Sequence, residues 1–482
     1  MRIAMAFYMQ FSRNRSRNQL KTVLAALSLA LLLTPSPAAP PPNGGPAVAG
    51  ETPAERDARI AWWRAARFGM FIHWDMSSLA GTEISWSRHG SKPLDITGDP
   101  AGYVADPVYD QLYRQFDPVQ FDAAAWVRLA QAAGMKYLVF TAKHHGGFCM
   151  WDTQYTDYSI MHTPFKRDVL KELAAACHAA GLRFGIYYSP RDWHQPDYGV
   201  GDNQKYVNYL DGQLRELLTG YGPVDLLWFD SYGHGDPLSF WHIPETWYLI
   251  KTLQPQVIIN NRLAALHVSN NPPVSRGDFD TPEQRLGKYQ DTRPWESCMT
   301  VVDAPHGGWS YRKDGTVQSL AACLRMLVSC ATGDGNLLLD VGPDATGVIP
   351  ADQSARLREI GQWLQTNGES IYGTRGGPFK PGDYGGTTRQ GQMVYVHVLQ
   401  WPASALQLPP LAAHLLSARL LSGGPVSARQ SPAGLEISVP LADRPPVDTV
   451  VALQFDRDVM HFPAVSVPVA ARSPAVTPPA RP

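Results

Sequence analysis

The chain has 482 residues, enough for more than one domain, and its 42 Lys+Arg against 43 Asp+Glu leave a net charge of −1. This balance excludes the strongly basic surface that binds a phosphate backbone or an anionic membrane, so nucleic acid is not expected as a partner. With 44% hydrophobic and 18% charged residues the composition excludes disorder throughout, and 41 Gly with 41 Pro indicate many turns.

The first 39 residues have the features of a secretory signal peptide. Basic residues precede a short apolar run at 23–33, and small residues follow at Ser36, Ala38 and Ala39. The run has about half of the roughly 20 residues that a membrane-spanning helix needs. We therefore predict an exported protein, periplasmic or secreted, that is free of the membrane after cleavage. Residues 40–55 and 466–482 are expected to be a Pro/Gly-rich linker and a disordered tail.

Between residues 56 and 372, short apolar runs alternate with stretches of helical period, which predicts parallel strands joined by crossover helices. The expected strands are residues 68–74, 137–142, 183–189, 225–230, 257–262, 297–302 and 336–341. The expected helices are residues 121–133, 168–180, 206–221, 317–331 and 354–366. Because no Gly-rich dinucleotide-binding turn follows the first strand, we favour a (β/α)8 TIM-like barrel over an open doubly wound sheet.

Residues 373–465 have a different texture, with short β-rich runs separated by Pro and Gly. Strands are expected at residues 392–399, 418–421, 434–439 and 449–454. The pattern predicts a small C-terminal antiparallel β-sandwich as a second domain. These strands show no exposed aromatic cluster, so we expect this domain to pack against the barrel rather than to bind glycan.

No metal or cofactor is expected. The five cysteines are an odd number without paired metal-ligand spacing, so at least one stays unpaired. His144 and His145 could be metal ligands, but adjacent residues on a strand point to opposite faces and no further ligand lies at helical spacing. We therefore interpret this pair as hydrogen-bonding groups for a ligand.

Polar residues end the predicted strands, and in a barrel these ends form the active site. The first strand leads to His73, the second to His144 and His145, the fourth to Asp230 and the fifth to Arg262. A loop after the fifth strand, residues 277–283, ends in Glu283. Each residue alone fits an ordinary cap or surface charge, but one rim would bring them all together. Two carboxylates among His, Arg and flat aromatic rings are what glycoside hydrolysis requires.

The two carboxylates are predicted to have different roles. Arg262 and the paired histidines would favour the charged form of Asp230 and keep its pKa low. Glu283, on a loop that closes against apolar rings, would have a raised pKa and act as the acid.

These residues lie in a series of motifs that resembles the family-29 glycoside hydrolases, the α-L-fucosidases. The matching stretches are residues 68–74, 133–137, 143–148, 166–168, 184–189, 228–230, 277–283 and 335–343, in order over roughly residues 60–375. The resemblance implies a barrel followed by a β-sandwich. It also implies a retaining reaction on terminal α-L-fucosyl groups of glycans or glycoconjugates, without a cofactor, through a covalent fucosyl-enzyme.

The family's functional residues transfer by motif. Its nucleophile falls on Asp230, and its acid/base falls on Glu283 in the pattern of many members or on Glu296 in that of others; we prefer Glu283. The candidates for contact with the sugar are Phe71, His73, Glu83, Trp86, His144, His145, Tyr188, Trp228, Arg262 and Trp309. Among them, Phe71 and Trp309 are expected to hold the fucose methyl group.

The chain departs from the family's pattern at two places. Glu83-Ile84-Ser85-Trp86 stands where a Glu-Trp-Tyr element is usual, and Gly146 stands where an Asp usually follows the paired histidines. Two other functions stay open: a non-catalytic fucoside-binding or sensor protein on the same barrel, and a retaining glycosidase for a related sugar. The sequence defines neither the linkage and aglycone nor the oligomeric state.

Overall fold

The computed structural model describes residues 51–89, 104–230, 239–263, 277–304, 307–402 and 405–468. The predicted signal peptide at 1–39, most of the predicted linker at 40–55 and the end of the tail at 466–482 lie outside these ranges. A helix begins at Pro53, so the last residues of the stretch 40–55 are helical. None of the helices in the described ranges is both long and apolar enough to span a membrane.

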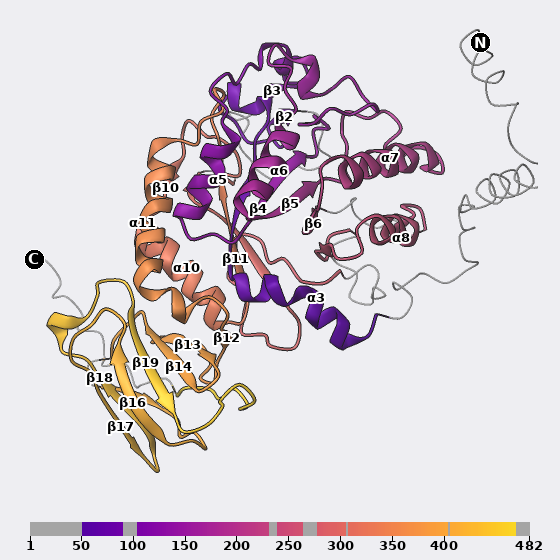
Figure 1. The fold of residues 1–482 in the computed structure, drawn as a ribbon. Helices are drawn as coiled ribbons and strands as arrows, with labels where there is room; N and C mark the ends of the chain where they lie inside the picture. The colour runs from indigo at the N-terminus through magenta and orange to yellow at the C-terminus, as the bar shows by residue number, and fades with distance from the viewer. Residues whose placement is uncertain are drawn as a thin grey trace, which may run out of the picture. The chain divides into compact units, whose positions relative to one another are not determined.

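Seven parallel strands form one curled sheet in the order β7-β6-β5-β4-β1-β11-β8. Figure 1 labels β4, β5, β6 and β11 of this sheet. They are β1 (Phe68–Ile72), β4 (Tyr137–Lys143), β5 (Arg183–Tyr188), β6 (Leu226–Phe229), β7 (Ile258–Ile259), β8 (Glu296–Thr300) and β11 (Asn336–Val341). All seven predicted strands are confirmed. Their near-continuous apolar runs follow from burial on both faces, which is typical of parallel sheets covered by helices.

The gap between the edge strands β7 and β8 is closed by residues 278–283. Isolated parallel bridges join Phe279 to Asn260 after β7, and Glu283 to Cys298 in β8. Backbone hydrogen bonds from Asp278 N–H to the Ile259 carbonyl (2.6 Å) and from Cys298 N–H to the Pro282 carbonyl (3.1 Å) support these bridges. The segment has no regular strand, in agreement with the predicted loop, but its bridges place it between β7 and β8, and Glu283 stands at its end.

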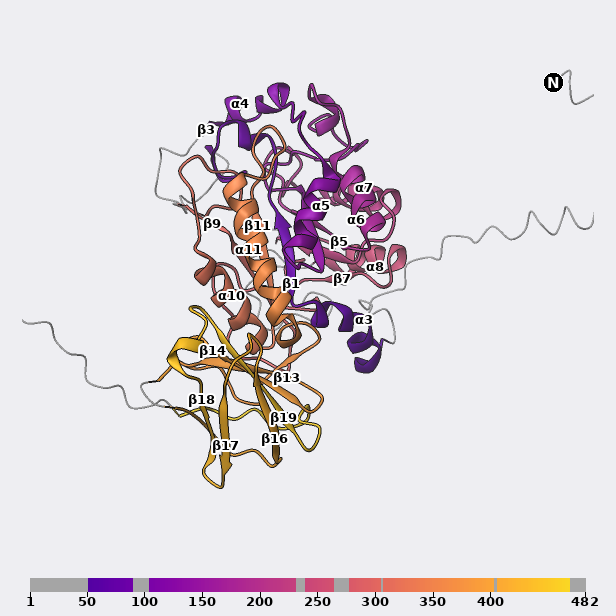
Figure 2. The same cartoon turned by 60° about the vertical axis from the view of Figure 1, so that its left-hand side comes forward.

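Helices surround the outside of the strands (Figures 1 and 2). They are α5 (Ala123–Ala132), α6 (Val169–Ala180), α7 (Gln204–Gly220), α8 (Ile243–Leu253), α10 (Leu320–Thr332) and α11 (Ala351–Asn367). A further helix, α3 (Pro53–Ala66), packs against the interior of the barrel instead. The helix ends follow the sequence signals: Asp168 caps α6 by accepting the Lys171 N–H at 2.8 Å, and Gly181 ends it with φ 65°. The five predicted helices correspond to α5, α6, α7, α10 and α11 and are confirmed. Helices α3 and α8 were not predicted.

Shorter elements occupy the connections. They are η1 (Met76–Leu79), β2 (Arg88–His89), β3 (Val104–Ala105), α4 (Asp106–Tyr109), η3 (Leu112–Gln115), η4 (Ile160–His162), β9 (Val302–Asp303), β10 (Thr316–Val317) and η5 (Gly368–Ser370).

The interior of the barrel is a hydrophobic cluster of its own. It contains Phe71, Tyr137, Val139, Tyr187, Leu226, Trp228, Ile258, Phe279, Cys298 and Leu338, with Ile60, Trp63 and Ala66 of α3. A second, larger cluster fills the layer between the strands and the outer helices. Alternate residues of each strand therefore face two different environments, as a pleated strand requires.

The C-terminal region is an antiparallel β-sandwich, as predicted. One sheet has the order β12-β13-β14-β19-β16 and the other β15-β18-β17. The strands are β12 (Arg375–Gly376), β13 (Gly385–Gln390), β14 (Met393–Val398), β15 (Leu406–Leu408), β16 (Leu415–Leu420), β17 (Ser427–Ser431), β18 (Gly434–Ser438) and β19 (Thr449–Phe455), with η6 (Leu441–Asp443) between the last two. Side chains such as Val396, Leu435, Ile437 and Leu453 form its core.

A buried ion cluster joins the end of α10 to the start of the sandwich. Asp334 lies 2.6 Å from Arg67 and 2.5 Å from Arg375, and it accepts the Gly376 N–H at 3.0 Å. Burial alone would raise the pKa of Asp334, but the two guanidinium groups hold it far below its ordinary value. Asp334 also has a φ of 71°, a conformation that Asp and Asn tolerate better than most residues.

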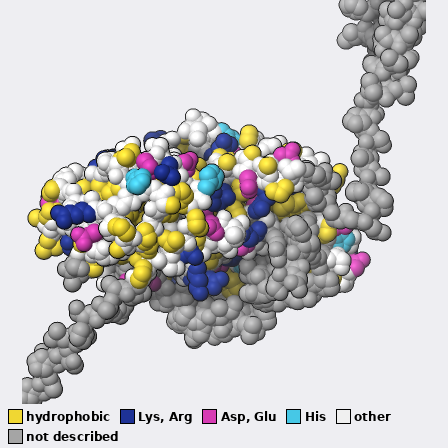
Figure 3. All heavy atoms as spheres, turned by 90° about the horizontal axis from the view of Figure 1, so that it is seen from below, with side chains coloured by type: hydrophobic (Ala, Val, Ile, Leu, Met, Phe, Trp, Pro, Cys, Tyr) yellow, Lys and Arg dark blue, Asp and Glu magenta, His cyan; other side chains and the backbone are white. Residues whose placement is uncertain are grey.

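The five cysteines are all buried, and none forms a disulfide. On the face seen in Figure 3, acidic and basic side chains of the described residues are interspersed with hydrophobic ones, and neither sign gathers into a large patch. This mixed surface fits the balanced charge of the sequence.

We predict that Asp334→Asn lowers the free energy of unfolding by about 3 kcal/mol at pH 7, because it leaves Arg67 buried without its counter-charge. The asparagine keeps the side-chain size and the backbone preference, so only the charge changes. Since the folded-state pKa of Asp334 is depressed, the wild-type advantage should be fully present above about pH 4 and should shrink as the pH falls. Urea denaturation at several pH values measures this.

Glu172→Gln is the matched control, because the Arg167–Glu172 pair (2.6 Å) is largely exposed and should contribute less than about 1 kcal/mol. Equal losses in the two variants would contradict the role given to Asp334.

Candidate active site

Asp230 follows β6 directly and is the centre of a group of side chains at the C-terminal ends of the strands. Its Oδ1 lies 2.8 Å from Arg262 Nη1, and its Oδ2 accepts a hydrogen bond from the Tyr187 hydroxyl at 2.9 Å. His145 Nε2 lies 3.3 Å from the same Oδ2. Burial alone would raise the pKa of Asp230, but the hydrogen bond from His145 and the charge of Arg262 hold it well below its ordinary value.

Arg262 connects Asp230 to Glu283. The same Nη1 atom lies 2.7 Å from Glu283 Oε2. Because both carboxylate oxygens contact one nitrogen, they can be no farther apart than 2.8 Å and 2.7 Å laid end to end, or about 5.5 Å. Pairs separated by about 5 to 5.5 Å are typical of retaining glycosidases, whereas inverting enzymes have about 6.5 to 9.5 Å.

The position of Arg262 is fixed from several sides. Its Nε donates to the Thr281 hydroxyl at 2.6 Å and its Nη2 to the Thr281 carbonyl at 2.9 Å. Its guanidinium carbon lies 4.6 Å from the centre of the Trp228 ring, a cation–π contact. The surroundings of Glu283 differ from our expectation: its side chain is 43% exposed and paired with Arg262, and it is not enclosed by apolar rings.

Three buried histidines, His73, His144 and His145, also line the site. Burial lowers the pKa of His73 to about 3 and also lowers the pKa values of His144 and His145. All three are therefore neutral near pH 7. His145 Nδ1 lies 2.6 Å from the Ser189 hydroxyl, which itself donates to the Arg191 carbonyl at 2.8 Å, so the ring of His145 is held from both of its nitrogens.

Among the described residues, the set of metal-ligand type is His144, His145 and Asp230, whose donor atoms lie within 4.8 Å of one another. Contrary to the parity argument from the sequence, both histidines reach the same site, because β4 ends at Lys143 just before them. The Arg262 guanidinium at 2.8 Å from Asp230 would repel a cation there. The donor set fits sugar hydroxyl groups better.

Aromatic rings form the floor and one wall. The Tyr187 and Trp228 rings are stacked with centroids 5.6 Å apart, and Phe71 lies 5.2 Å from Trp228. Trp309 packs 5.1 Å from His73 and 6.2 Å from Phe71. The predicted residues Phe71, Trp228 and Trp309 are thus brought to one place.

Glu83 and Trp86 also reach the site. Glu83 accepts the backbone N–H groups of Gly308 (3.0 Å) and Trp309 (3.3 Å), and burial raises its pKa to about 7. Trp86 packs against His145 with ring centroids 5.4 Å apart. The altered Glu-Trp-Tyr element therefore still places its carboxyl group and its indole ring at the barrel mouth.

Tyr188 is not in the site, which corrects our prediction. Its hydroxyl donates to Gln213 (2.8 Å) and lies 3.0 Å from Lys143 Nζ, in the layer between the strands and the outer helices. The reason is strand parity: neighbouring residues point to opposite faces, so Tyr187 faces the barrel interior and Tyr188 faces outward.

Glu296, the alternative acid/base, lies at the start of β8 and is fully buried inside the barrel. Its carboxylate accepts hydrogen bonds from the Tyr137 hydroxyl and from the indole N–H groups of Trp63 and Trp228, the latter two at 3.2 Å. Burial raises its pKa to about 7 in spite of these donors. Enclosed on all sides, Glu296 is placed to orient Trp228 rather than to reach a leaving group.

Three residues of the site were missed by sequence reasoning. Tyr187 pairs with Trp228, two residues before Asp230, so the alternation of side chains along β5 and β6 would have placed it on the same face as Asp230. Trp193, which packs against His145 and Trp86 with centroids 5.2 Å away, had no signal in its loop. Asp340, 2.7 Å from His73, lies in the matched motif at 335–343 but was not assigned a role.

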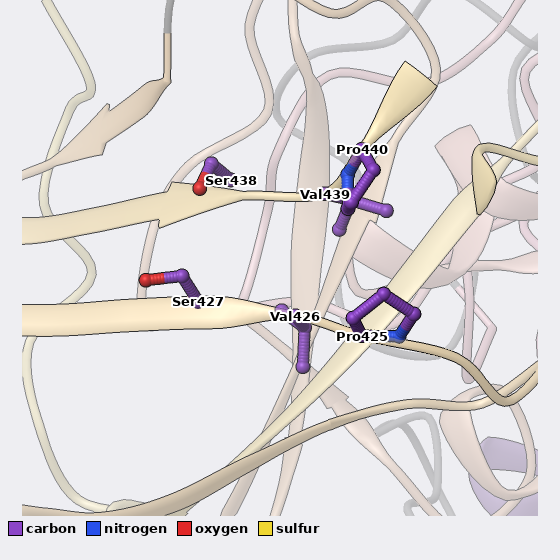
Figure 4. Close-up of a pocket in the computed structure, with 6 residues that line it drawn as sticks. All are labelled: Pro425, Val426, Ser427, Ser438, Val439 and Pro440. Carbon is purple, nitrogen blue, oxygen red and sulfur yellow. The ribbon is translucent and has the colours of Figure 1, made fainter. Parts of the chain in front are cut away.

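A second concavity lies on the sandwich (Figure 4). It is lined by Pro425, Val426, Ser427, Ser438, Val439 and Pro440. It holds no carboxylate, histidine or aromatic ring, so it lacks the groups that hydrolysis needs.

Comparison with known proteins agrees with this geometry. A family model described as Alpha-L-fucosidase matches residues 49–369, which is most of the chain. The human plasma alpha-L-fucosidase is 31% identical over 373 residues, covering 71% of this chain and 77% of that protein, and the rat protein is 30% identical over 368 residues, covering 71% and 78%.

Solved structures give the same result. Alpha-L-fucosidase isoenzyme 1 from Paenibacillus thiaminolyticus has 34% identity and a TM-score of 0.73, covering 83% of this chain and 99% of that one. A Bacteroides thetaiotaomicron alpha-L-fucosidase, described as a trapped covalent intermediate, has 28% identity and a TM-score of 0.73, covering 86% and 98%. With paired carboxylates at the mouth of its barrel, the chain is a glycoside hydrolase. It belongs to the α-L-fucosidase family.

We predict that Arg262→Gln moves the acidic limb of the pH profile of kcat/KM to higher pH. The substitution removes the charge that depresses the pKa of Asp230, so the pKa rises, and attack by the ionised carboxylate fails as the pH drops through the new value. Rates on an aryl α-L-fucoside between pH 3 and 8 measure the shift.

Arg167→Gln, in the surface pair with Glu172 at the start of α6, is the control for this experiment. An unchanged acidic limb in a folded Arg262 variant would show that Arg262 does not set the charge of Asp230.

Proposed function

We propose that the protein is a retaining α-L-fucosidase that releases terminal α-L-fucosyl residues from glycans or glycoconjugates through a covalent fucosyl-enzyme. The observation that carries this proposal is the contact of Asp230 and Glu283 with one nitrogen of Arg262, which keeps the two carboxylates close enough for double displacement. The covalent intermediate described for the Bacteroides thetaiotaomicron relative supports it.

In the first step, an oxygen of Asp230 attacks the anomeric carbon and the glycosidic C–O bond breaks. Glu283 gives its proton to the departing oxygen and becomes a carboxylate. A bound sugar would cover the exposed side chain of Glu283, which acts as the acid only when it carries a proton. The leaving group then departs through the exposed side of the site.

In the second step, Glu283 takes a proton from water, and the water oxygen displaces Asp230 from the anomeric carbon. One negative charge is present throughout: it starts on Asp230, moves to Glu283 and returns. Since both carboxylates contact Arg262 Nη1, the charge stays next to the same cation in each state. No reorientation of the guanidinium is needed between the steps.

The other groups are proposed to bind the fucose. His73, His144, His145 and Glu83 supply hydrogen-bonding atoms for hydroxyl groups, and Trp86 stands beside them. The fucose methyl group would rest against Phe71 and Trp309. A buried methyl contributes roughly 0.8 kcal/mol, so selection against a hydroxylated sugar such as L-galactose also needs the lack of a polar partner for its extra hydroxyl.

Asp230→Ala should lower kcat on an aryl α-L-fucoside by at least about 10⁴-fold, because no fucosyl-enzyme can form. Glu283→Ala should slow the second step by about 10² to 10⁴-fold, and azide should restore turnover by attacking the fucosyl-enzyme to give α-fucosyl azide. Steady-state rates and proton NMR of the first product measure both. The wild type should release α-L-fucose first.

Glu296→Gln is the control that separates the two candidate acids: it should show no azide rescue. Undiminished turnover in the Asp230 variant would end the proposal. Fucoside binding without hydrolysis by the pure wild type would favour the sensor function, and faster hydrolysis of another aryl glycoside would favour a related sugar. A panel of fucosylated oligosaccharides assayed for released fucose would define the linkage.

We also propose export through the N-terminal leader. The support is the sequence of residues 1–39, with basic residues before an apolar run and small residues after it. Expression of the full chain in a Gram-negative host should give a processed protein in the periplasm whose N-terminus, read by Edman degradation, falls near residue 40. A cytoplasmic protein that keeps its leader would contradict this.

A further inference from the structure

His73 and Asp340 form a buried pair that the reaction scheme above does not use. His73 follows β1 and Asp340 lies in the adjacent strand β11, and the distance from His73 Nδ1 to Asp340 Oδ1 is 2.7 Å. The side chains are 4% and 0% exposed. The His73 backbone N–H also donates to the Val341 carbonyl at 3.3 Å, so both partners are held by the sheet itself.

The outer atoms of the pair, Asp340 Oδ2 and His73 Nε2, take no part in the contact between the two side chains. Asp340 Oδ2 is buried and has no hydrogen-bond partner among the described residues. His73 Nε2 likewise makes no hydrogen bond with any described residue, although its ring lies among Tyr187, His144 and Trp309, with centroids 5.1 to 5.6 Å away. A sugar in the site would therefore meet Nε2 of His73. Whether that nitrogen is a donor or an acceptor depends on the proton that Asp340 shares with Nδ1.

The charges around the pair disfavour an anion at Asp340. Asp340 is faced by Glu83, from the loop after η1, which lies near Arg312. His73 is faced by Asp230 from the end of β6, by His144 and His145 from the end of β4, and by Tyr187 on β5. Burial first, and then the neighbouring carboxyl of Glu83, raise the pKa of Asp340 well above its ordinary value. Burial lowers the pKa of His73 to about 3.

Proton counting gives the consequence. If the pair holds two protons and the carboxylic acid donates from Oδ1 to Nδ1, the hydrogen of the neutral ring is on Nε2. If it holds one, that proton lies on Nδ1 facing a carboxylate, and Nε2 is bare. We propose that Asp340 is a positioning residue for the fucosidase reaction, which keeps the second proton on the pair and makes His73 Nε2 an N–H donor to a sugar hydroxyl oxygen. This inference rests on the proposed function.

The tautomer can be read directly by ¹⁵N NMR of the protein labelled at histidine, with His73→Gln to assign the signals. Near pH 7, Nε2 of His73 should give the signal of a protonated ring nitrogen. A bare, pyridine-type Nε2 in the wild type would overturn the proposal. This measurement needs neither turnover nor a variant of Asp340 that folds.

Binding of L-fucose, measured by titration calorimetry, tests the consequence for affinity. Asp340→Asn, whose amide can donate to Nδ1, should keep Kd within about threefold, whereas Asp340→Leu should weaken binding by about 10-fold or more. A Leu variant that folds and binds fucose as the wild type does would contradict the proposal.

The sandwich offers a matched control. His397 Nδ1 lies 2.7 Å from Asp448 Oδ2, and both side chains are fully buried, far along the chain from the sugar site. Asp448→Asn should leave fucose binding unchanged, and a loss there would show that the assay reports general damage. Fucose binding with the predicted tautomer but without hydrolysis would refute the proposed function while leaving the role of Asp340 intact.

Discussion

One guanidinium nitrogen organises this site. Arg262 is 2% exposed, and a buried cation is costly unless anionic partners surround it. Asp230 and Glu283 supply those partners at 2.8 Å and 2.7 Å, while Thr281 and the Trp228 ring hold the rest of the side chain. The spacing of the two carboxylates, which decides the chemistry, is therefore set by their shared contact with Arg262.

The contacts of Arg262 continue into the barrel interior through Trp228. Glu296 accepts the indole N–H of Trp228, and Trp228 in turn stacks on Tyr187 and lies under Arg262. A polar group so deep is acceptable only because three donors satisfy it. Through Trp63, the same carboxylate also contacts α3. The residue that the family pattern offered as an alternative acid thus has a physical role in the floor of the site.

The sequence predicted most of the fold because parallel strands covered on both faces leave long apolar runs, and the polar residues that end them mark the rim. The face to which each strand residue points was harder to predict. Tyr187 and Tyr188 are neighbours of the same type, and the pairing of β5 with β6 shows that Tyr187 is the one that faces Asp230. Residues 278–283 are mostly polar and include a proline, so nothing in them indicated that they would bridge the two edge strands. Strand β13 begins Gly-Gly-Thr-Thr and was missed for the same reason. Contacts between distant segments, such as His73 with Asp340, have no local signal at all.

The buried histidines complete the electrostatic design. Had His73, His144 and His145 been charged, Asp230 would face several cations and be a weaker nucleophile, and Arg262 would no longer govern the two carboxylates. Burial lowers the pKa of each, so the rings offer neutral hydrogen-bond donors and acceptors. A neutral ring still needs a partner to fix which nitrogen carries the hydrogen. Ser189, 2.6 Å from His145 Nδ1, and Asp340, 2.7 Å from His73 Nδ1, are placed to do this, so under the proposed function recognition of the sugar would depend on groups behind the rings.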